Sequence, residues 1–267
     1  RDITIRDLLC HASGLGQGIY GLISMKLDKS KRESLAALEQ KYSTMPLDFQ
    51  PGKGGGYSPL AGFDLLARVV EVVSGLPFDA YLQQNLFDPL GMQDTAFRLD
   101  DAQTARLVHV YKREKNRLRD VTDTAEDMDS LLKHGENYTA GCGGLFSTLH
   151  DYDRFAHMLL NGGEVDGVRV LQPETVRLMG QQGSTDYPDP DPGCAWGLGM
   201  KIRKDPRKAK SACTAGTFGW SGAFGTHFFV SPKDHLSAVW MMNRSDIDGA
   251  GSYISKKIEE LVFGCFV

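Results

Sequence analysis

The order of helical and strand patterns restricts the fold of this chain more than any other feature of its sequence. Apolar residues recur at helical spacing through the first two-thirds of the chain, most clearly over residues 60–73. Strand patterns are confined to the last third, at residues 196–202, 226–230 and 236–242, and a helical pattern follows at 252–263. Helices followed by a block of strands indicate an α+β fold.

The strands near the C-terminus are too few to make a sheet of ordinary size. Nothing before residue 100 supplies more, so we expect the N-terminal strands of this sheet to lie outside the chain. Because open sheet edges promote unwanted pairing, another segment or another chain is predicted to cover the edge. We predict a mostly helical lobe at residues 1–147, with a charged insert at 100–137. Residues 148–267 are predicted to hold helices, the antiparallel strands and the terminal helix of an α/β lobe.

Several local predictions concern burial. The helix at residues 60–73 carries a broad apolar face, which predicts that it is buried on most sides. In the amphipathic terminal helix, Leu261 is predicted to face inward and Glu259 outward. A glycine-rich turn is predicted at residues 219–225, and the basic stretch 203–210 is predicted to be a solvated loop.

Composition excludes some classes of partner. The chain has 267 residues and a net charge of -4, and it shows no basic stripe, so nucleic acid is not predicted as a partner. No apolar run reaches the roughly 20 residues of a membrane span, and Asp64 and Arg68 interrupt the longest one. The first residue is not methionine, so the natural N-terminus is expected upstream and the sequence leaves secretion open.

The five cysteines point to no disulfide framework and no metal site. Their number is odd and no two are closely spaced, which favours free thiols in a reducing, cytoplasmic compartment. Cys142, in a glycine-rich segment, is interpreted as a packed small residue rather than a nucleophile. No cofactor is predicted.

Five short segments carry a family resemblance. They are residues 3–15 (ITIRDLLCHASGL), Tyr57-Ser58-Pro59, residues 88–95 (DPLGMQDT), residues 140–148 (AGCGGLFST) and Trp220-Ser221-Gly222. In the same order they resemble the "LRDLLTHTSGL", Tyr-x-Asn, "PLGMxDT", "AGGGLxST" and Lys-Thr-Gly segments of the class C β-lactamase-like serine hydrolases. That family includes family VIII carboxylesterases, penicillin-binding DD-peptidases and related acyl transferases. The resemblance covers nearly the whole chain and implies a β-lactamase/DD-peptidase-like fold.

The resemblance implies acyl transfer through a serine ester. It assigns Tyr57 as the proton relay, the Ala223 N–H as an oxyanion donor, and Ser58, Trp220, Ser221 and Gly222 to the substrate-binding surface. The family's nucleophile is a Ser-x-x-Lys motif that precedes the tyrosine. The only formal match here, Ser130 to Lys133, follows Tyr57 in a charged stretch and is interpreted as chance. The chain is therefore predicted to lack the nucleophile and to be inactive alone.

Two departures from the family pattern bear on the substrate. Pro59 has no side-chain amide to hold a carbonyl, and Trp220 replaces the cation that normally receives a carboxylate. A small neutral ester is therefore predicted rather than a β-lactam. The alternatives are a β-lactamase or DD-peptidase, and a catalytically inactive fragment or binding module.

A different hypothesis makes Ser221 a nucleophile. Residues 219–223 (GWSGA) nearly match the Gly-x-Ser-x-Gly elbow of α/β-hydrolases, which requires an acid and a histidine later in the chain. Only His227 and His235 follow, and both lie close by in the strand region.

Overall fold

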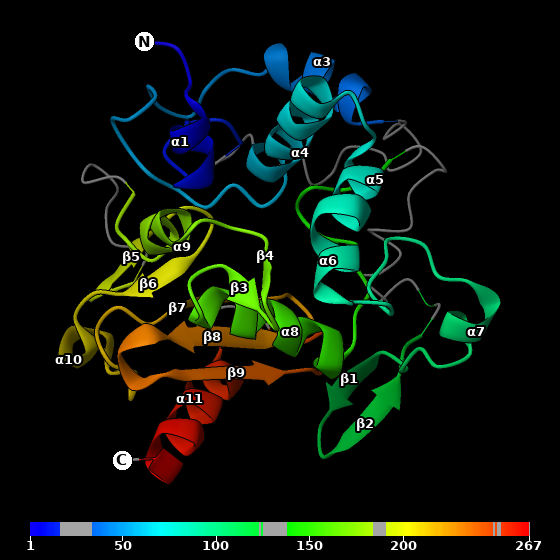
Figure 1. Cartoon of the computed structure of the whole chain (residues 1–267), viewed down its shortest axis with the longest axis vertical. Coiled ribbons are helices and arrows are strands. Elements are labelled where there is room, and N and C mark those ends of the chain that lie inside the picture. The colour runs from blue at the N-terminus through cyan, green and yellow to red at the C-terminus, as the bar shows by residue number, and fades with distance from the viewer. Residues whose placement is uncertain are drawn as a thin grey trace.

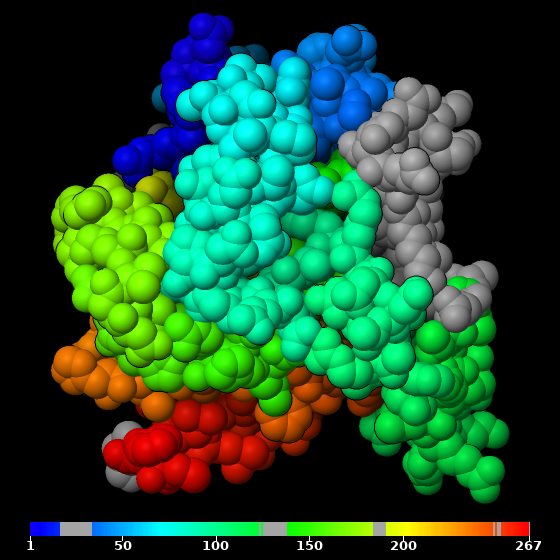
Figure 2. Space-filling model, turned by 45° about the vertical axis from the view of Figure 1, so that its right-hand side comes forward, coloured from blue at the N-terminus to red at the C-terminus, as the bar shows by residue number. Residues whose placement is uncertain are grey.

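A computed structural model describes residues 1–16, 34–122, 124, 138–183, 191–247, 249 and 252–266. The N-terminal helices lie at one end of the molecule and the C-terminal helix α11 at the other, with the main sheet between them (Figure 1; Figure 2). The helices are α1 (Ile5–Leu9), α3 (Leu35–Ser43), α4 (Ala61–Ser74), α5 (Phe78–Leu82), the π-helical turn η2 (Gln83–Phe87), α6 (Asp88–Leu90), α7 (Asp101–Thr104), α8 (Leu149–Leu160), α9 (Pro173–Met179), α10 (Pro206–Ala209), the 3-10 turn η4 (Pro232–Asp234) and α11 (Tyr253–Phe266). The predicted α+β fold is confirmed.

The main sheet has five antiparallel strands in the order β5-β6-β7-β8-β9. They are β5 (Cys194–Trp196), β6 (Lys201–Arg203), β7 (Phe218–Ser221), β8 (His227–Ser231) and β9 (Leu236–Trp240), and two short hairpins pair β1 (Tyr111–Glu114) with β2 (Arg117–Asp120) and β3 (Glu164–Val165) with β4 (Val168–Arg169). Side chains alternate between the two faces of a strand. Phe228 and Val230 therefore pack in the core on the α8 face, and Phe229 packs against Phe263 of α11 on the other face.

The prediction that the helix at residues 60–73 is buried on most sides is wrong. Val72 and Val73 are 64% and 83% exposed, while the buried residues of α4 are Ala61, Gly62, Asp64 and Ala67. Its fully buried apolar positions are small residues, which let neighbouring backbones approach closely. At the facing segment, a Cβ on Gly141 would lie 2.1 Å from the Phe63 carbonyl oxygen.

Two predictions about the strands are also wrong. Residues 196–202 form a hairpin rather than one strand, because the Gly197 N–H bonds the Met200 carbonyl at 2.8 Å between β5 and β6. The predicted turn at 219–225 begins later, since β7 extends to Ser221. Gly219 lies within β7, where a Cβ would come within 2.1 Å of the Phe228 carbonyl oxygen. This glycine permits close strand packing rather than a turn.

The terminal helix differs from its predicted orientation. Glu259 is 3% exposed and Leu261 is 60% exposed, the reverse of what was predicted. The stretch 203–210 is likewise not a solvated loop throughout. Arg203 belongs to β6 and forms an ion pair with Glu259, and α10 follows. The opposite charges of Arg203 and Glu259 are therefore buried together as a pair.

Two further expectations can be compared with the structure. Within the described ranges, no helix combines the length and apolar character that a membrane crossing requires. No disulfide joins any of the five cysteines, all of which lie within the described ranges. The charged insert at residues 100–137 contains the β1–β2 hairpin, and residues 125–137 of it lie outside the described part of the chain.

Candidate active site

The loop that carries Tyr57 is attached to the turn after α1 on both sides of the tyrosine. The Gly56 N–H donates to the His11 carbonyl at 3.1 Å, and the Ser58 N–H donates to His11 Nδ1, also at 3.1 Å. His11 is 1% exposed and has a positive φ of 55°. One residue therefore binds the backbone amides of both neighbours of Tyr57.

Ser58 connects this loop to the start of α4. Its hydroxyl donates to the Leu15 carbonyl at 3.1 Å and accepts from the Gly62 N–H at 3.0 Å, and the residue is 1% exposed. The N-cap residue Leu60 makes no side-chain hydrogen bond, so Ser58 satisfies a helix amide that would otherwise be open. These contacts support the loop, and the predicted substrate contact of Ser58 stays a prediction.

Five rings, including that of Tyr57, pack together, and we call His11, Tyr57, Phe63, Trp196 and Trp220 the aromatic cluster. The Tyr57 centroid lies 4.8 Å from His11, 5.3 Å from Trp220 and 6.0 Å from Trp196, onto which it stacks. The two tryptophans are 4.7 Å apart. The cluster joins the helical region to β5 and β7 of the sheet. Tyr57 remains 45% exposed, so its ring forms part of the surface.

The environment raises the pKa of the Tyr57 phenol above its usual value of 10.0. Burial among the neighbouring rings is the main cause, and the Cys142 thiol adds to it. A hydrogen bond from the Trp220 side chain acts in the opposite direction and does not outweigh them. None of these influences from the described residues is a cation. Tyr57 is therefore protonated at neutral pH in this chain.

Trp220 and Ser221 point to opposite faces of β7. Trp220 lies in the aromatic cluster beside Tyr57. The Ser221 hydroxyl instead lies 2.8 Å from His227 Nδ1, on the face covered by α11. Adjacent residues of a strand must alternate in this way, so only one of them can face the tyrosine. The structure thus brings Trp220, and not the Ser221 side chain, to Tyr57.

The turn after β7 contains two backbone N–H groups of interest, one bonded within the turn and one without an acceptor among the described residues. The Gly222 N–H donates to the Thr226 carbonyl at 2.9 Å. Ala223 is exposed, and its N–H has no hydrogen-bond acceptor in the part of the chain that the structure describes. A Cβ on Gly222 would lie 2.3 Å from Thr226 Oγ1, which explains a glycine at this position. The Gly222 amide is therefore already bonded within the turn, and the donor role of the Ala223 amide stays a prediction.

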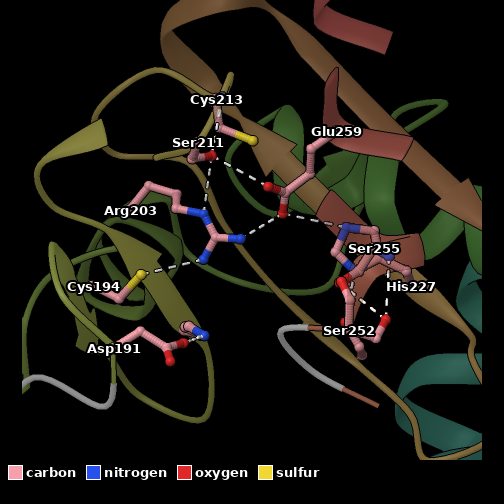
Figure 3. Close-up of polar contacts among 11 residues, drawn as sticks. Asp191, Cys194, Arg203, Ser211, Cys213, His227, Ser252, Ser255 and Glu259 are labelled. Atoms are coloured by element: carbon pink, nitrogen blue, oxygen red, sulfur yellow. Dashed lines mark hydrogen bonds and ion pairs between the residues drawn. The ribbon is translucent and has the colours of Figure 1, made fainter. Parts of the chain in front are cut away.

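A buried polar network lies on the opposite face of the sheet (Figure 3). Arg203 Nη2 lies 2.6 Å from Glu259 Oε1, and the Ser211 hydroxyl donates to Glu259 Oε2 at 3.2 Å. His227 Nε2 is 3.5 Å from the same carboxylate. Burial raises the pKa of Glu259, but His227 and Arg203 outweigh this effect and hold the pKa below its usual value. The carboxylate is therefore charged and joins β6 and β8 to α11.

Ser221, His227 and Glu259 have the residue types of a catalytic triad, but their setting does not fit a nucleophile elbow. Ser221 lies within a regular strand, paired with His227, and it has no positive φ. It is 7% exposed beside a cavity of about 20 Å³, which has room for about one water molecule. An elbow instead places the serine on a strained, open turn. The arrangement thus argues against attack by Ser221.

Sequence reasoning missed three residues that support the site. His11 and Trp196 belong to the aromatic cluster, and the Asp64 carboxylate holds the glycine-rich segment by accepting from the Gly141 N–H at 3.0 Å. The position of His11 inside the first family-like segment was the available signal. Asp64 had been regarded only as an interruption of an apolar helix. Among the described residues, no group of three metal-ligating side chains is present.

The chain is similar to a known protein family, and to individual known proteins, over most of its length. A family model described as Beta-lactamase matches residues 1–261. Protein Rv1367c of Mycobacterium tuberculosis is 33% identical over 261 residues, which cover 91% of this chain and 62% of that protein. The chain therefore spans less than two-thirds of this relative.

Two solved structures have similar folds. EstCE1, described as a hydrolase with promiscuous acyltransferase activity, superposes with a TM-score of 0.80 at 23% identity, covering 98% of this chain and 72% of that chain. The LovD6 mutant of simvastatin synthase from Aspergillus terreus gives a TM-score of 0.74 at 26% identity. The match covers 99% of this chain and 66% of that chain. The β-lactamase-like fold that the sequence predicts is confirmed.

Proposed function

The chain belongs to the beta-lactamase family, and from that premise we propose that the complete polypeptide is a serine esterase or acyl transferase. The observation that carries the proposal is the position of Tyr57, partly exposed and packed against Trp196 and Trp220. The reaction passes through a serine acyl-enzyme, as the β-lactamase-like resemblance implies.

Tyr57 is proposed to protonate the leaving alcohol. Its raised pKa keeps the phenol O–H intact at neutral pH, so it is available as a proton donor when an alkoxide leaves the tetrahedral intermediate. To accept a proton from the nucleophile, the phenol would need a cationic neighbour that lowers its pKa. We propose that this cation and the nucleophilic serine come from outside the 267 residues. The Ser130–Lys133 match lies outside the described residues.

The substrate class follows from the aromatic surroundings of Tyr57. Trp196 and Trp220 present apolar ring faces and donate only through indole N–H groups. Pro59 adds no amide, and position 220 holds no cation. A carboxylate-bearing β-lactam or peptide would lose its usual partner here. A small neutral ester is therefore the proposed substrate, and the Ala223 N–H is the proposed oxyanion donor.

The test is ester hydrolysis by the complete polypeptide with its natural upstream sequence. With a short-chain nitrophenyl ester, Tyr57→Phe is expected to lower kcat by about 100-fold or more, because it removes the proton donor. The matched control, Ser221→Ala, is expected to keep kcat within about threefold, since this hydroxyl faces away from Tyr57.

Three results would contradict this proposal. Full activity in Tyr57→Phe would remove the role of the tyrosine. Ester turnover by the 267-residue chain alone, abolished in Ser221→Ala, would support the elbow hypothesis instead. Acylation of the complete polypeptide by a fluorescent penicillin would favour the β-lactamase or DD-peptidase alternative.

A further inference from the structure

We propose that His11 is a positioning residue that sets the location of the Tyr57 phenol. The proposal rests on the proposed function, in which Tyr57 is the proton donor. His11 accepts the Gly56 N–H with its carbonyl oxygen and the Ser58 N–H with Nδ1, each at 3.1 Å. Gly56 and Ser58 are the residues immediately before and after Tyr57. A single residue thus binds the backbone of the Tyr57 loop at two points.

The His11 ring also contacts the Tyr57 side chain. The two ring centroids are 4.8 Å apart, and Phe63 and Trp196 lie 5.4 and 4.5 Å from His11. The imidazole is 1% exposed, whereas Tyr57 is 45% exposed. The buried His11 ring therefore packs beneath the partly exposed Tyr57 ring and limits the orientations that the phenol can take.

The protonation state of His11 matches this role. Burial lowers its pKa to about 4, so the ring is neutral at pH 7. Nδ1 accepts the Ser58 N–H, and the ring proton must therefore be on Nε2. Nε2 is buried and has no hydrogen-bond partner among the described residues. The indole of Trp196 lies edge-on beside the ring.

Two local costs are concentrated at this one residue. An unpaired buried N–H is unfavourable, and so is a positive φ in a residue other than glycine. A structure keeps such costs where the surrounding contacts require that conformation. At His11 the contacts that require it are the two bonds to the Tyr57 loop.

Substitutions at this position can separate loop positioning from general stability. His11→Asn places an amide oxygen at the position of Nδ1, where it can accept the Ser58 N–H, and asparagine tolerates positive φ. His11→Ala removes the acceptor and the ring together. Val176→Ala is the matched control, since Val176 is a 6% exposed core residue on α9, outside the aromatic cluster.

The experiment uses the complete polypeptide and two measurements. With a nitrophenyl ester, His11→Ala is expected to lower kcat by about tenfold or more with KM changed by less than about twofold, because misplaced catalytic groups mainly affect the chemical step. His11→Asn is expected to recover kcat to within about threefold, and Val176→Ala to leave it unchanged. In ¹³C-tyrosine NMR, the Tyr57 signal, assigned with Tyr57→Phe, should shift in His11→Ala and shift less in His11→Asn, which keeps an acceptor for the Ser58 N–H but lacks the ring.

The two measurements distinguish failure of this proposal from failure of the proposed function. A wild-type polypeptide without ester turnover would contradict the proposed function, while the NMR comparison would still test His11. An unchanged Tyr57 signal in His11→Ala would overturn the positioning role. So would a loss of kcat in Val176→Ala equal to the loss in His11→Ala.

Discussion

At the scale of single residues, buried polar groups determine how the helical region is assembled. Asp64 is 1% exposed and accepts hydrogen bonds from the Tyr42 and Tyr138 hydroxyls at 3.1 Å and from the Gly141 N–H at 3.0 Å. Hydrogen bonds to a charged acceptor contribute about 1.5–3 kcal/mol each. His11 has a comparable role for the Tyr57 loop. Both residues look unremarkable in the hydrophobic pattern, because that pattern records only which positions are apolar.

His11 should make the stability of the protein depend on pH in a defined window. Its pKa is about 4 in the folded state against an ordinary 6.5, so below pH 6.5 the unfolded state binds a proton that the folded state excludes. The stabilisation is complete above pH 6.5 and is lost as the pH falls toward 4, by up to about 3 kcal/mol. Urea unfolding at pH 7, 6, 5 and 4 should show a smaller loss in His11→Asn than in wild type. Equal losses in the two proteins would contradict this prediction.

At the scale of elements, charged residues attach the terminal helix to the sheet. Glu259 of α11 reaches Arg203 of β6 and His227 of β8, and both ends of the Arg203–Glu259 pair are largely buried (Figure 3). The apolar residue Leu261 is exposed on the same helix. An amphipathic pattern predicts that α11 is a helix, but it assigns these two positions to the wrong sides. The difference arises because a buried partner compensates the charge of Glu259, which no helical period can show.

Two neighbouring glutamates on α11 offer a matched comparison. Glu259→Gln is expected to lower the free energy of unfolding by about 3–5 kcal/mol, because it leaves the Arg203 charge buried without its partner. Glu260→Gln is expected to change it by less than about 0.5 kcal/mol, since Glu260 is exposed in its pair with Lys257. Urea unfolding at pH 7 measures both. Similar effects in the two variants would show that the buried pair does not stabilise the packing of α11.

At the scale of the whole molecule, the main sheet is covered on both faces, and in the described part of the chain β9 pairs with a strand on one side only. Helix α8 packs against one face and α11 against the other, while β5 and β9 are the outer strands among the described residues. The chain also spans 62% of Protein Rv1367c. We propose that a further strand of the complete polypeptide pairs with β9, because an open strand edge is prone to unwanted association.

Hydrogen exchange can test this proposal. In the 267-residue chain, the backbone amides of β9 that point away from β8 are expected to exchange much faster than the amides of β8. Strand β8 is paired on both sides, with β7 and with β9. In the complete polypeptide the same β9 amides should become protected. Protection of β9 that is identical in both proteins would contradict pairing with a segment outside this chain.

The amino-acid sequence alone indicates the α+β class and the β-lactamase-like family and singles out Tyr57 and Trp220 as candidate site residues, because short motifs in a defined order can be recognised without knowledge of contacts. Local periodicity in the sequence also places β8, β9 and α11 approximately. Three features are set by tertiary contacts instead: Ser221 turns away from Tyr57, His11 bonds the Tyr57 loop, and Glu259 is buried. Each of these depends on which distant residue lies opposite, and contacts between distant segments leave no local pattern in the chain.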